Sequence, residues 1–498
     1  MNHMFKKTVL ALICGLIFSL GFAPFDLWFL SILSILSLLF LLDETSNKES
    51  FLIGYTFGFG MWLSGISWLY VSIHSYGNMG FIGSVLIILL FICILSLYSG
   101  LLFLFNNYLK SFAPKTLLIF TLPVAWTSIE LMRSYLFTGF PWLISGTMLA
   151  DTPIDGLTPI IGAQGNSFFM VIISVLLFEI IKGLRSKKWS KFLILFTISL
   201  LISSVLLRPF SWTNPVAEVR VSIHQPNLTL EEKWSQLGLI KTQEMMLQAV
   251  TEAKQDELIV FPETALVLSE RDNKAFMDLL TIKSSENSVT LISGIVERED
   301  SKRIRNRLQA FGNVNTYYDK VKLVPFGEFI PFESILGDLL DIIGLNLTNT
   351  IPGSEIKAIN NGILKISPSI CYEIAFDELI RKTARNSNIL VTISNDTWFG
   401  RSIGPIQHLE IAQNRALEHN KPLIRSTNSG ISAFISEKGK ITEKQDYFEE
   451  KALQNQVMLY SGHTFYANYG NMPLIFLIMI FFFCIGVRSY LFKKKDYK

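Results

Sequence analysis

The chain has 498 residues, half of which are hydrophobic, and a formal net charge of +3. A soluble protein of this length would rarely combine so much apolar sequence with so few charges, and no run of Lys or Arg is long enough to predict a nucleic-acid partner. The apolar residues crowd into 1–207 and 473–492, whereas 208–470 has the composition of an ordinary globular domain. This contrast indicates a membrane protein with one domain in water.

About eight stretches are long and apolar enough to cross a bilayer, which takes about 20 mostly apolar residues in a helix. Their approximate limits are 8–23, 25–42, 51–73, 81–105, 115–135, 157–182, 190–207 and 473–492. We therefore expect three parts. A membrane bundle of seven spans covers 1–207, an extracytoplasmic α/β domain covers 208–470, and a last span with a basic tail covers 471–498.

The distribution of Lys and Arg predicts the orientation, because loops on the cytoplasmic side carry an excess of basic residues. With a cytoplasmic N-terminus, the outside loops around 74–80 and 136–156 contain no Lys or Arg. The inside loops and the C-terminal tail contain Lys48, Lys110, Lys115, Arg185, Lys187, Lys188, Lys191, Arg488, Lys493, Lys494 and Lys495. We therefore expect both termini in the cytoplasm and 208–470 in the periplasm of a cell with two membranes.

Residues 208–470 alternate short β-branched runs with longer amphipathic stretches. Predicted strands cover 217–223, 257–261, 289–296, 363–369, 389–394 and 431–435, and predicted helices cover 235–254 and 404–420. This alternation favours an α/β layered fold, in which functional residues usually lie at the ends of strands.

Three residues with reactive side chains lie at such ends. Glu263 follows one apolar run, Cys371 ends another, and Lys320 lies in a Pro- and Gly-rich segment. Taken singly, a Glu after a strand usually caps a helix or is solvated, and a free Cys belongs to the core more often than not, by about three to one. Their occurrence together favours a site. No disulfide can form inside the domain, because the other cysteines, Cys14, Cys93 and Cys484, lie in apolar runs.

The stretches around these residues resemble one protein family. Phe261-Pro262-Glu263-Thr264, the Lys320 segment that ends in Val324-Pro325-Phe326-Gly327-Glu328, and Cys371-Tyr372-Glu373 are similar to the Glu-Lys-Cys signature of the nitrilase superfamily. Stretches 393–400, 404–408 and 425–431 also resemble its membrane branch, the apolipoprotein N-acyltransferases. The eight predicted spans, with the domain before the last, fit this branch, so the resemblance covers essentially the whole chain.

The resemblance implies roles for individual residues. Glu263 is the general base, Lys320 stabilises the oxyanion and Cys371 is the nucleophile. Positions similar to the family's supporting or substrate-binding residues are Trp234, Asn306, Glu328, Tyr372 and Glu373. We expect Glu328 and Glu373 to hold the site together rather than to transfer protons.

The resemblance also implies an αββα sandwich on a membrane bundle in a bacterial inner membrane, with a monomer as the default. The enzyme would move the sn-1 acyl chain of a phospholipid, typically phosphatidylethanolamine, to the α-amine of a diacylglyceryl-cysteine lipoprotein, without metal or cofactor. Residues 146–149 read Gly-Thr-Met-Leu where many members have Gly-Tyr-Ser-Gln, so no lipid contacts are carried over there.

These residue types suit acyl transfer through a thioester, since a covalent intermediate divides one difficult step into two easier ones. A free thiol has a pKa near 8.5, so we expect Glu263 to take its proton. We expect Lys320 to keep Glu263 ionised and to favour the thiolate. A helix predicted over 372–386 would add its N-terminal dipole, and the kinetics should be ping-pong.

Other segments keep two interpretations. The apolar stretch 330–351 is either a core helix with a loop or an arm that dips into the outer leaflet and excludes water. The aromatic loops 68–77 and 140–142 either anchor the interface or line a lipid-entry cleft. The histidines His224, His408, His419 and His463 form no metal spacing and are expected to be structural.

Two other functions compete. A membrane-tethered amidase or nitrile hydrolase would use the same triad, but the apolar arm and the spans disfavour a small soluble substrate. A transporter or scaffold with an inactive outer domain is disfavoured by the intact triad. It is also disfavoured because most spans lack ionisable residues, Glu130 and Arg133 being the exceptions.

Overall fold

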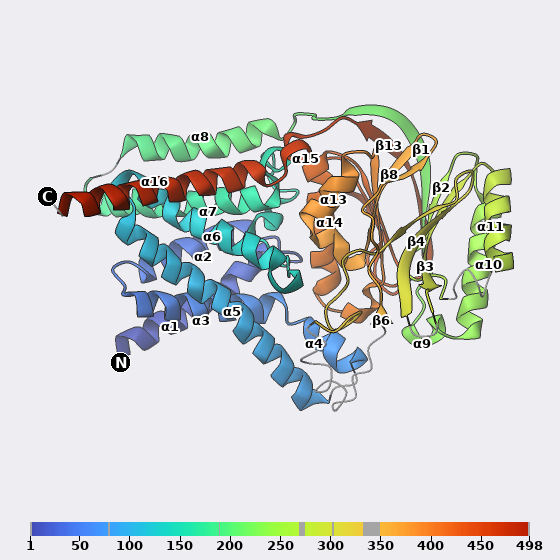
Figure 1. Cartoon of the computed structure of the whole chain (residues 1–498), viewed down its shortest axis with the longest axis horizontal. Helices are drawn as coiled ribbons and strands as arrows, with labels where there is room; N and C mark the ends of the chain where they lie inside the picture. Colours follow the sequence, from blue (N-terminus) through green and yellow to red (C-terminus); the bar gives the residue numbers. More distant parts are fainter. Residues whose placement is uncertain are drawn as a thin grey trace. The chain divides into compact units, whose positions relative to one another are not determined.

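The computed structural model describes residues 2–77, 80–188, 190–267, 274–300, 303–331 and 349–496. The chain divides into two compact units, one made of Met1–Phe210 and Tyr469–Lys498 and the other of Ser211–Asn468. The first unit is helical, and the second contains every strand of the described residues (Figure 1). The arm predicted over 330–351 falls mostly outside the described residues.

The helical unit has one helix for each predicted span. These are α1 (Asn2–Phe18), α2 (Trp28–Leu41), α3 (Asn47–Gly65), α5 (Phe81–Phe112), α6 (Leu118–Tyr135), α7 (Thr158–Arg185), α8 (Lys191–Leu207) and α16 (Met472–Asp496). Among the described residues, four segments are long and apolar enough to cross a membrane: His3–Gly21, Phe81–Phe112, Lys115–Thr138 and Thr158–Arg185. Three shorter apolar helices accompany them. Eight crossings therefore remain a prediction.

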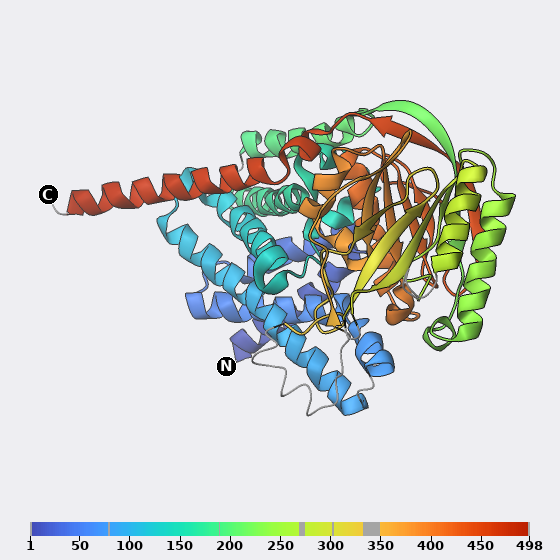
Figure 2. The same cartoon turned by 45° about the vertical axis from the view of Figure 1, so that its right-hand side comes forward.

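Small residues bring the helices of this unit close together. Helix α3 packs against both α1 and α5 (Figure 2). A Cβ at Gly15 would lie 2.0 Å from the Phe57 carbonyl oxygen, and one at Gly58 would lie 2.6 Å from the Ser99 side chain. Such contacts leave no room for a side chain at these positions. In a membrane, where the hydrophobic effect does not drive helices together, small residues allow the close packing that does.

The two charged residues of α6 hold a loop in the same unit. Glu130 is buried, and its Oε1 accepts hydrogen bonds from Trp126 Nε1 (2.9 Å) and from the Ser145 amide (3.0 Å). Arg133 Nη1 donates to the carbonyl oxygens of Phe140 and Trp142, at 2.5 and 2.7 Å. Buried ionisable groups are costly unless they are paired in this way. These contacts give both residues a structural role in fixing the loop 140–145.

The second unit contains two mixed sheets. The first has the order β13 (Lys451–Ser461), β1 (Asn214–Gln225), β2 (Leu258–Val260), β3 (Thr290–Arg298), β4 (Arg303–Phe311) and β5 (Thr316–Asp319), with β6 (Asn349–Thr350) beside β4. The second has the order β12 (Ile441–Lys444), β11 (Ala433–Ile435), β10 (Leu423–Thr427), β9 (Ile389–Ser394), β8 (Leu364–Ile370) and β7 (Ile359–Asn361). Strands β1, β2 and β3 run parallel, and so do β8, β9 and β10.

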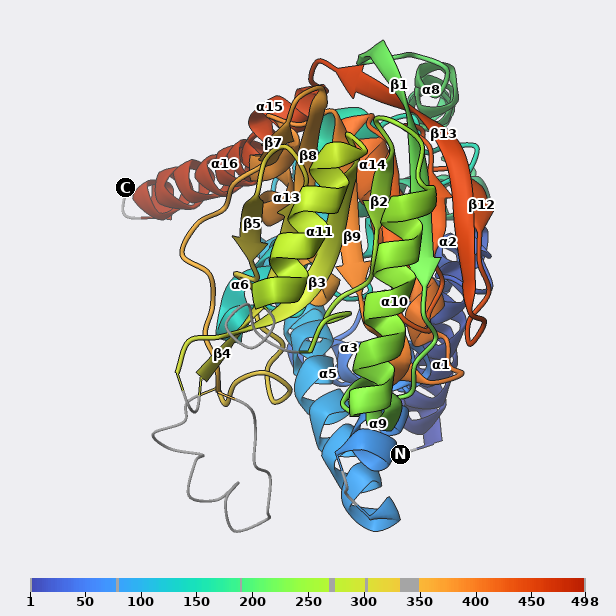
Figure 3. The same cartoon turned by 90° about the vertical axis from the view of Figure 1, so that its right-hand side faces the viewer.

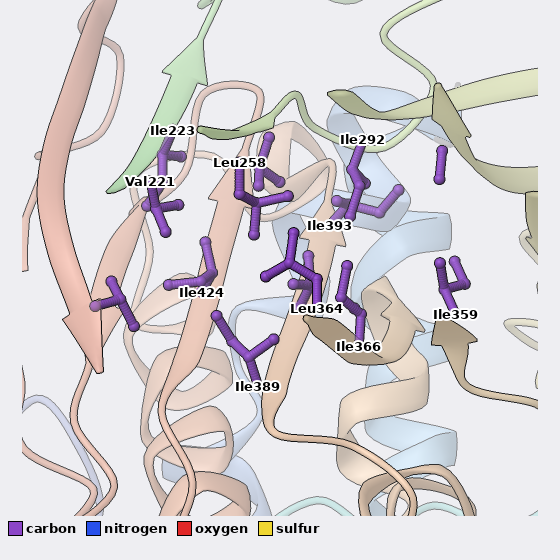
Figure 4. Packing of buried hydrophobic residues seen from close by; sticks show 14 of the residues in the cluster. Val221, Ile223, Leu258, Ile292, Ile359, Leu364, Ile366, Ile389, Ile393 and Ile424 are labelled. Carbon is purple, nitrogen blue, oxygen red and sulfur yellow. The ribbon is translucent and has the colours of Figure 1, made fainter. Parts of the chain in front are cut away.

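The two sheets pack face to face through branched aliphatic side chains (Figure 4). Val221 and Leu258 of the first sheet belong to the same buried cluster as Ile366 and Ile389 of the second. Such chains suit strands that are buried on both faces. Burying one of them is worth about 1.5–3 kcal/mol, so this layer fixes how the sheets align.

Helices cover the outer faces of both sheets. Helices α10 (Gln236–Glu252) and α11 (Lys274–Glu286) lie side by side on the first sheet (Figure 3). Helices α13 (Asp377–Ala384) and α14 (Gly404–His419) contact strands β8 and β10 of the second sheet. The α/β class predicted for this region is therefore confirmed, with two sheets between helical layers.

Most local predictions agree with the observed elements. Each of the six predicted strands overlaps an observed strand, and the predicted helices 235–254 and 404–420 correspond to α10 and α14. The helix predicted over 372–386 is interrupted. A 3-10 turn over Cys371–Ala375 precedes α13, which begins only at Asp377.

Candidate active site

The three candidate catalytic residues follow strands of both sheets. Glu263 comes after β2 and Lys320 directly after β5, both in the first sheet. Cys371 follows β8, which lies between β9 and the edge strand β7 of the second sheet. The sheets are joined here by the Asn395 amide, which follows β9 and donates to Glu263 Oε2 at 2.8 Å.

Four of the candidate residues form one buried hydrogen-bonded cluster. Lys320 Nζ donates to Glu328 Oε1 at 2.8 Å and to Glu263 Oε1 at 3.3 Å. Asn306 Nδ2, from β4, donates to Glu263 Oε1 at 2.6 Å. Lys320 is 1% exposed and Glu263 is 6% exposed. Ionised groups this deeply buried need partners of this kind.

The backbone around Glu263 depends on one glycine. A Cβ at Gly294 of β3 would lie 2.3 Å from the Thr264 nitrogen and 2.6 Å from the Glu263 Cα atom. Position 294 therefore has room only for hydrogen. Thr264 itself has φ +47°, a left-handed conformation that is uncommon for a β-branched residue.

Cys371 is half-buried and has φ +53°, a conformation that costs a non-glycine residue about 1–3 kcal/mol and that clusters at functional sites. The backbone around it is held at two points. The amide of the preceding residue, Ile370, donates to Glu373 Oε2 at 2.9 Å, and the Cys371 carbonyl oxygen lies 3.1 Å from His408 Nε2. A carbonyl only accepts, so Nε2 of His408 carries a proton.

Glu373 is fully buried and joins the Lys320 turn to the end of β8. Its Oε1 accepts hydrogen bonds from the amides of Val321 (2.6 Å) and Lys322 (3.0 Å) and from the Tyr318 hydroxyl (3.0 Å). Together with the Ile370 amide, these donors fill both carboxylate oxygens. These contacts tie the two backbone segments together, and the positioning role expected from the sequence stays a prediction.

The last two sequence-derived candidates are aromatic. Tyr372 is 9% exposed and packs edge-on against Phe376, with ring centroids 5.0 Å apart. Trp234 ends the turn after α9 (Leu230–Lys233) and is 59% exposed. Within the described ranges, no three His, Cys, Asp or Glu residues are grouped as metal ligands would be.

Comparison with known proteins places this architecture. Residues 14–176 match the family model described as apolipoprotein N-acyltransferase N-terminal domain, and residues 220–461 match carbon-nitrogen hydrolase. An apolipoprotein N-acyltransferase from Vibrio parahaemolyticus is 32% identical over 509 residues, which cover 99% of each chain. The chain belongs to the apolipoprotein N-acyltransferase family. A relative with the same name from Haemophilus influenzae is 33% identical over 515 residues, covering 100% of this chain and 97% of the relative.

One solved structure has a partial likeness to this chain. The crystal structure of Saccharomyces cerevisiae Nit3, a member of branch 10 of the nitrilase superfamily, aligns with 49% of this chain and 91% of its own, with 17% identity and a TM-score of 0.38.

As a member of the apolipoprotein N-acyltransferase family, the protein is an acyltransferase, and it is a membrane protein with several apolar helices.

In this N-acyltransferase, neighbouring charges determine the protonation states of Glu263 and Lys320. Burial raises the pKa of Glu263, but Lys320, the Asn306 hydrogen bond and Lys233 outweigh it and lower the pKa below its usual value. Burial lowers the pKa of Lys320, but Glu328 and Glu263 raise it well above its usual value. The resting site therefore holds a carboxylate and an ammonium.

The thiol of this N-acyltransferase stays protonated at rest. Burial and the Glu263 charge raise the pKa of Cys371 to about 12, and the opposing effect of Lys320 is smaller. Lys320 lowers the pKa of Cys371, as expected, but the desolvation of the thiol raises it by more. A nucleophilic role of Cys371, as predicted from the sequence, would require the loss of this proton, and the predicted base Glu263 is a carboxylate whose charge acts on the thiol.

Sequence reasoning missed two groups of residues at this N-acyltransferase site. One is Lys233, buried beside the exposed Trp234, whose Nζ donates to the Glu263 carbonyl oxygen at 2.8 Å. The other is a buried network behind Cys371, in which Arg425 Nη2 donates to Asp396 Oδ2 (2.5 Å) and to His408 Nδ1 (3.0 Å). The signal for the second was present, because 393–400, 404–408 and 425–431 were all matched as motifs without a role.

Proposed function

We propose that the protein transfers an acyl chain from a phospholipid, through a thioester on Cys371, to the N-terminal amine of a diacylglyceryl-cysteine lipoprotein. The relatives' name specifies acyl transfer to the nitrogen of an apolipoprotein. The observation that carries the proposal is the 3.3 Å contact between Lys320 Nζ and Glu263 Oε1, beside the strand end that bears Cys371. This contact pairs the proposed base, the Glu263 carboxylate, with the Lys320 ammonium near the proposed nucleophile.

In the first half-reaction, Glu263 takes the Cys371 proton as the sulfur attacks the ester carbonyl of the phospholipid. The carbonyl oxygen becomes an oxyanion. Lys320 Nζ contacts Glu263 and Glu328 with two of its three protons, which leaves one for this oxyanion. One such donor is typically worth about 3 kcal/mol. When the intermediate collapses, the C–O bond breaks and Glu263 protonates the leaving lysophospholipid oxygen.

In the second half-reaction, the neutral amine of the acceptor attacks the thioester carbonyl. Glu263 accepts the proton that the nitrogen loses, the C–S bond breaks, and the same proton returns to the Cys371 sulfur. The products are an amide and the free thiol, so the enzyme is restored. Because the donor leaves before the acceptor reacts, the kinetics are ping-pong.

The membrane arrangement belongs to the same proposal. Eight spans, cytoplasmic termini and a periplasmic catalytic domain are supported by the lack of Lys and Arg around 74–80 and 136–156. A donor in the outer leaflet of the inner membrane and a lipid-anchored acceptor would both reach such a domain. The protein acts as a monomer in this scheme.

The decisive experiment follows the acyl group on the purified full-length protein. The protein is incubated with phospholipid that carries a labelled sn-1 chain, and the mass of the Cys371 peptide is measured before and after a diacylated lipopeptide is added. An acyl mass on Cys371 that passes to the lipopeptide amine is expected. Cys371→Ala should form no adduct, whereas Cys484→Ala, in the apolar helix α16, should behave as the wild type.

Two results would reject the proposal. One is labelling that persists in Cys371→Ala, because the acyl group would then be carried elsewhere. The other is an acyl group released only to water, which would favour the membrane-tethered hydrolase that uses the same triad.

A further inference from the structure

Lys233 is buried at the candidate active site. It ends α9, is 3% exposed and donates from Nζ to the main-chain carbonyl of Glu263 at 2.8 Å. Lysine is almost never fully buried unless it is paired. Within the described ranges, that carbonyl is the single hydrogen-bond acceptor that this ammonium contacts, although an ammonium has three donors.

The groups that compensate this buried charge belong to the site itself. Burial lowers the pKa of Lys233 to about 8, and the charge of Glu263 opposes the shift, as does that of Cys371 once it is a thiolate. Because this value lies above 7, the ammonium form predominates at neutral pH. Lys233 therefore supplies a second cation close to both the base and the nucleophile.

The charge of the cluster shows what this cation does. Lys320 contacts two carboxylates, those of Glu263 and Glu328, so these three residues together have an excess of negative charge. Lys233 cancels that excess. Without it, a thiolate at Cys371 or an oxyanion on the substrate would form in a site that is already negative and shielded from water, where charges interact strongly.

We propose that Lys233 is a positioning residue that fixes the main chain of Glu263 and offsets the negative charge that develops at Cys371. The inference rests on the proposed role of Cys371 as the nucleophile. Lys233 acts through Glu263 and through the local potential, and it needs no contact with substrate.

The test compares the reactivity of Cys371 in three variants of the full-length protein. Lys233→Met removes the charge and the donor, Lys233→Gln removes the charge but keeps a donor, and Lys233→Arg keeps both. A matched control is Lys421→Met. Lys421 is 2% exposed, donates to the Ala384 and Ser387 carbonyl oxygens, and has a pKa lowered by burial to about 8, but neither contact is with the site.

The rate of Cys371 alkylation by iodoacetamide is measured between pH 6 and 10, by mass spectrometry of the peptide. The charged groups that face Cys371 are Glu263, Lys320, Asp396 and Lys233, with His408 at its carbonyl oxygen. A nearby opposite charge shifts a pKa by about 1–3 units. We therefore expect Lys233→Met and Lys233→Gln to react about tenfold more slowly below about pH 8, where wild-type Lys233 is charged, and Lys233→Arg to stay within about threefold of the wild type there. The difference between the wild type and the uncharged variants should shrink at higher pH, as Lys233 loses its proton.

The control separates charge from folding. Lys421→Met should lose thermal stability and keep the wild-type alkylation profile. The inference is overturned if Lys233→Gln, folded by the same thermal criterion, has the profile of the wild type. If Lys233→Met unfolds, the Gln and Arg variants decide the matter, because they differ in charge.

A second measurement separates this inference from the proposed function. The rate of acyl-adduct formation on Cys371 with labelled phospholipid is compared between the wild type and Lys233→Gln. A wild-type protein that forms no adduct defeats the proposed function, while the alkylation profiles still test the charge effect. A wild type and a variant that form the adduct equally fast defeat the inference alone.

Discussion

The hydrogen bond from His408 to the carbonyl of Cys371, the proposed nucleophile, gives a sharp prediction. His408 is fully buried, and Nε2 lies 3.1 Å from the Cys371 carbonyl oxygen while Nδ1 accepts from Arg425 at 3.0 Å. Burial and the Arg425 charge lower the pKa of His408, so the ring is neutral. A Gln side chain places its amide nitrogen near the Nε2 position, whereas Asn reaches only as far as Nδ1. The pair His408→Gln and His408→Asn therefore isolates the bond to Cys371.

The magnitude follows from the left-handed conformation of Cys371. Its φ of +53° costs about 1–3 kcal/mol, and the bond from His408 helps to hold it. Without that bond, the nucleophile can relax before it reacts, and each 1.4 kcal/mol is about a tenfold change in rate. We expect His408→Asn to acylate Cys371 about 10–100 times more slowly, and His408→Gln to stay within about threefold.

The thermal stability of the His408 variants should separate them less clearly than the acylation rate does. An unsatisfied buried carbonyl costs about 1–3 kcal/mol, so His408→Asn should also melt several degrees lower, by about 2–4 °C per kcal/mol in a domain of this size. The assay is the rate of adduct formation from labelled phospholipid, beside thermal unfolding of the same samples. His463→Asn, an exposed histidine of the same unit, is the control. Equal acylation rates in the Asn and Gln variants would refute the reasoning.

Three further predictions concern the same site. Gly294→Ala should destabilise the protein by about 1–3 kcal/mol and slow acylation more than tenfold, because its Cβ would lie 2.6 Å from the Glu263 Cα atom; thermal unfolding and adduct formation measure the two effects. Burial raises the pKa of Asp396, but the Arg425 charge lowers it well below its usual value. Its contribution to stability is therefore present above about pH 4 and lost as pH falls below it, so melting temperature should depend less on acid pH in Asp396→Asn. Glu328→Gln should slow adduct formation about tenfold, since it removes the closer carboxylate partner of Lys320, at 2.8 Å; an unchanged rate would contradict this role.

The sequence was informative where local composition decides the structure. Strands such as 257–261 and 389–394 are short, apolar and β-branched, and the structure buries them between other layers. It was uninformative for β4 and β13. Arg303–Phe311 interrupts its apolar residues with three arginines, and Lys451–Ser461 is an edge strand with many polar and exposed residues. The edge strand β13 became clear only through its pairing with the distant strand β1, which no local pattern encodes.

The candidate site divides in the same way. Glu263, Lys320 and Cys371 follow recognisable runs, so motif and position were enough to select them. Lys233 gave no such signal, because a Lys in the segment Leu-Glu-Glu-Lys reads as an exposed helical residue, and its burial depends on the Glu263 carbonyl 30 positions later. The interruption of the helix predicted over 372–386 was missed too, because it depends on the backbone of Cys371.

The division of the site between two sheets has a consequence for how activity is lost. The proposed base and cation are attached to one sheet and the proposed nucleophile to the other, and the aliphatic layer in Figure 4 is what holds them in register. A half-molecule with only one sheet would have no functioning centre, however well it folded. Truncating Ile366 or Leu258, which belong to this layer, should shift one sheet relative to the other, and turnover would then fail at temperatures where the fold still persists.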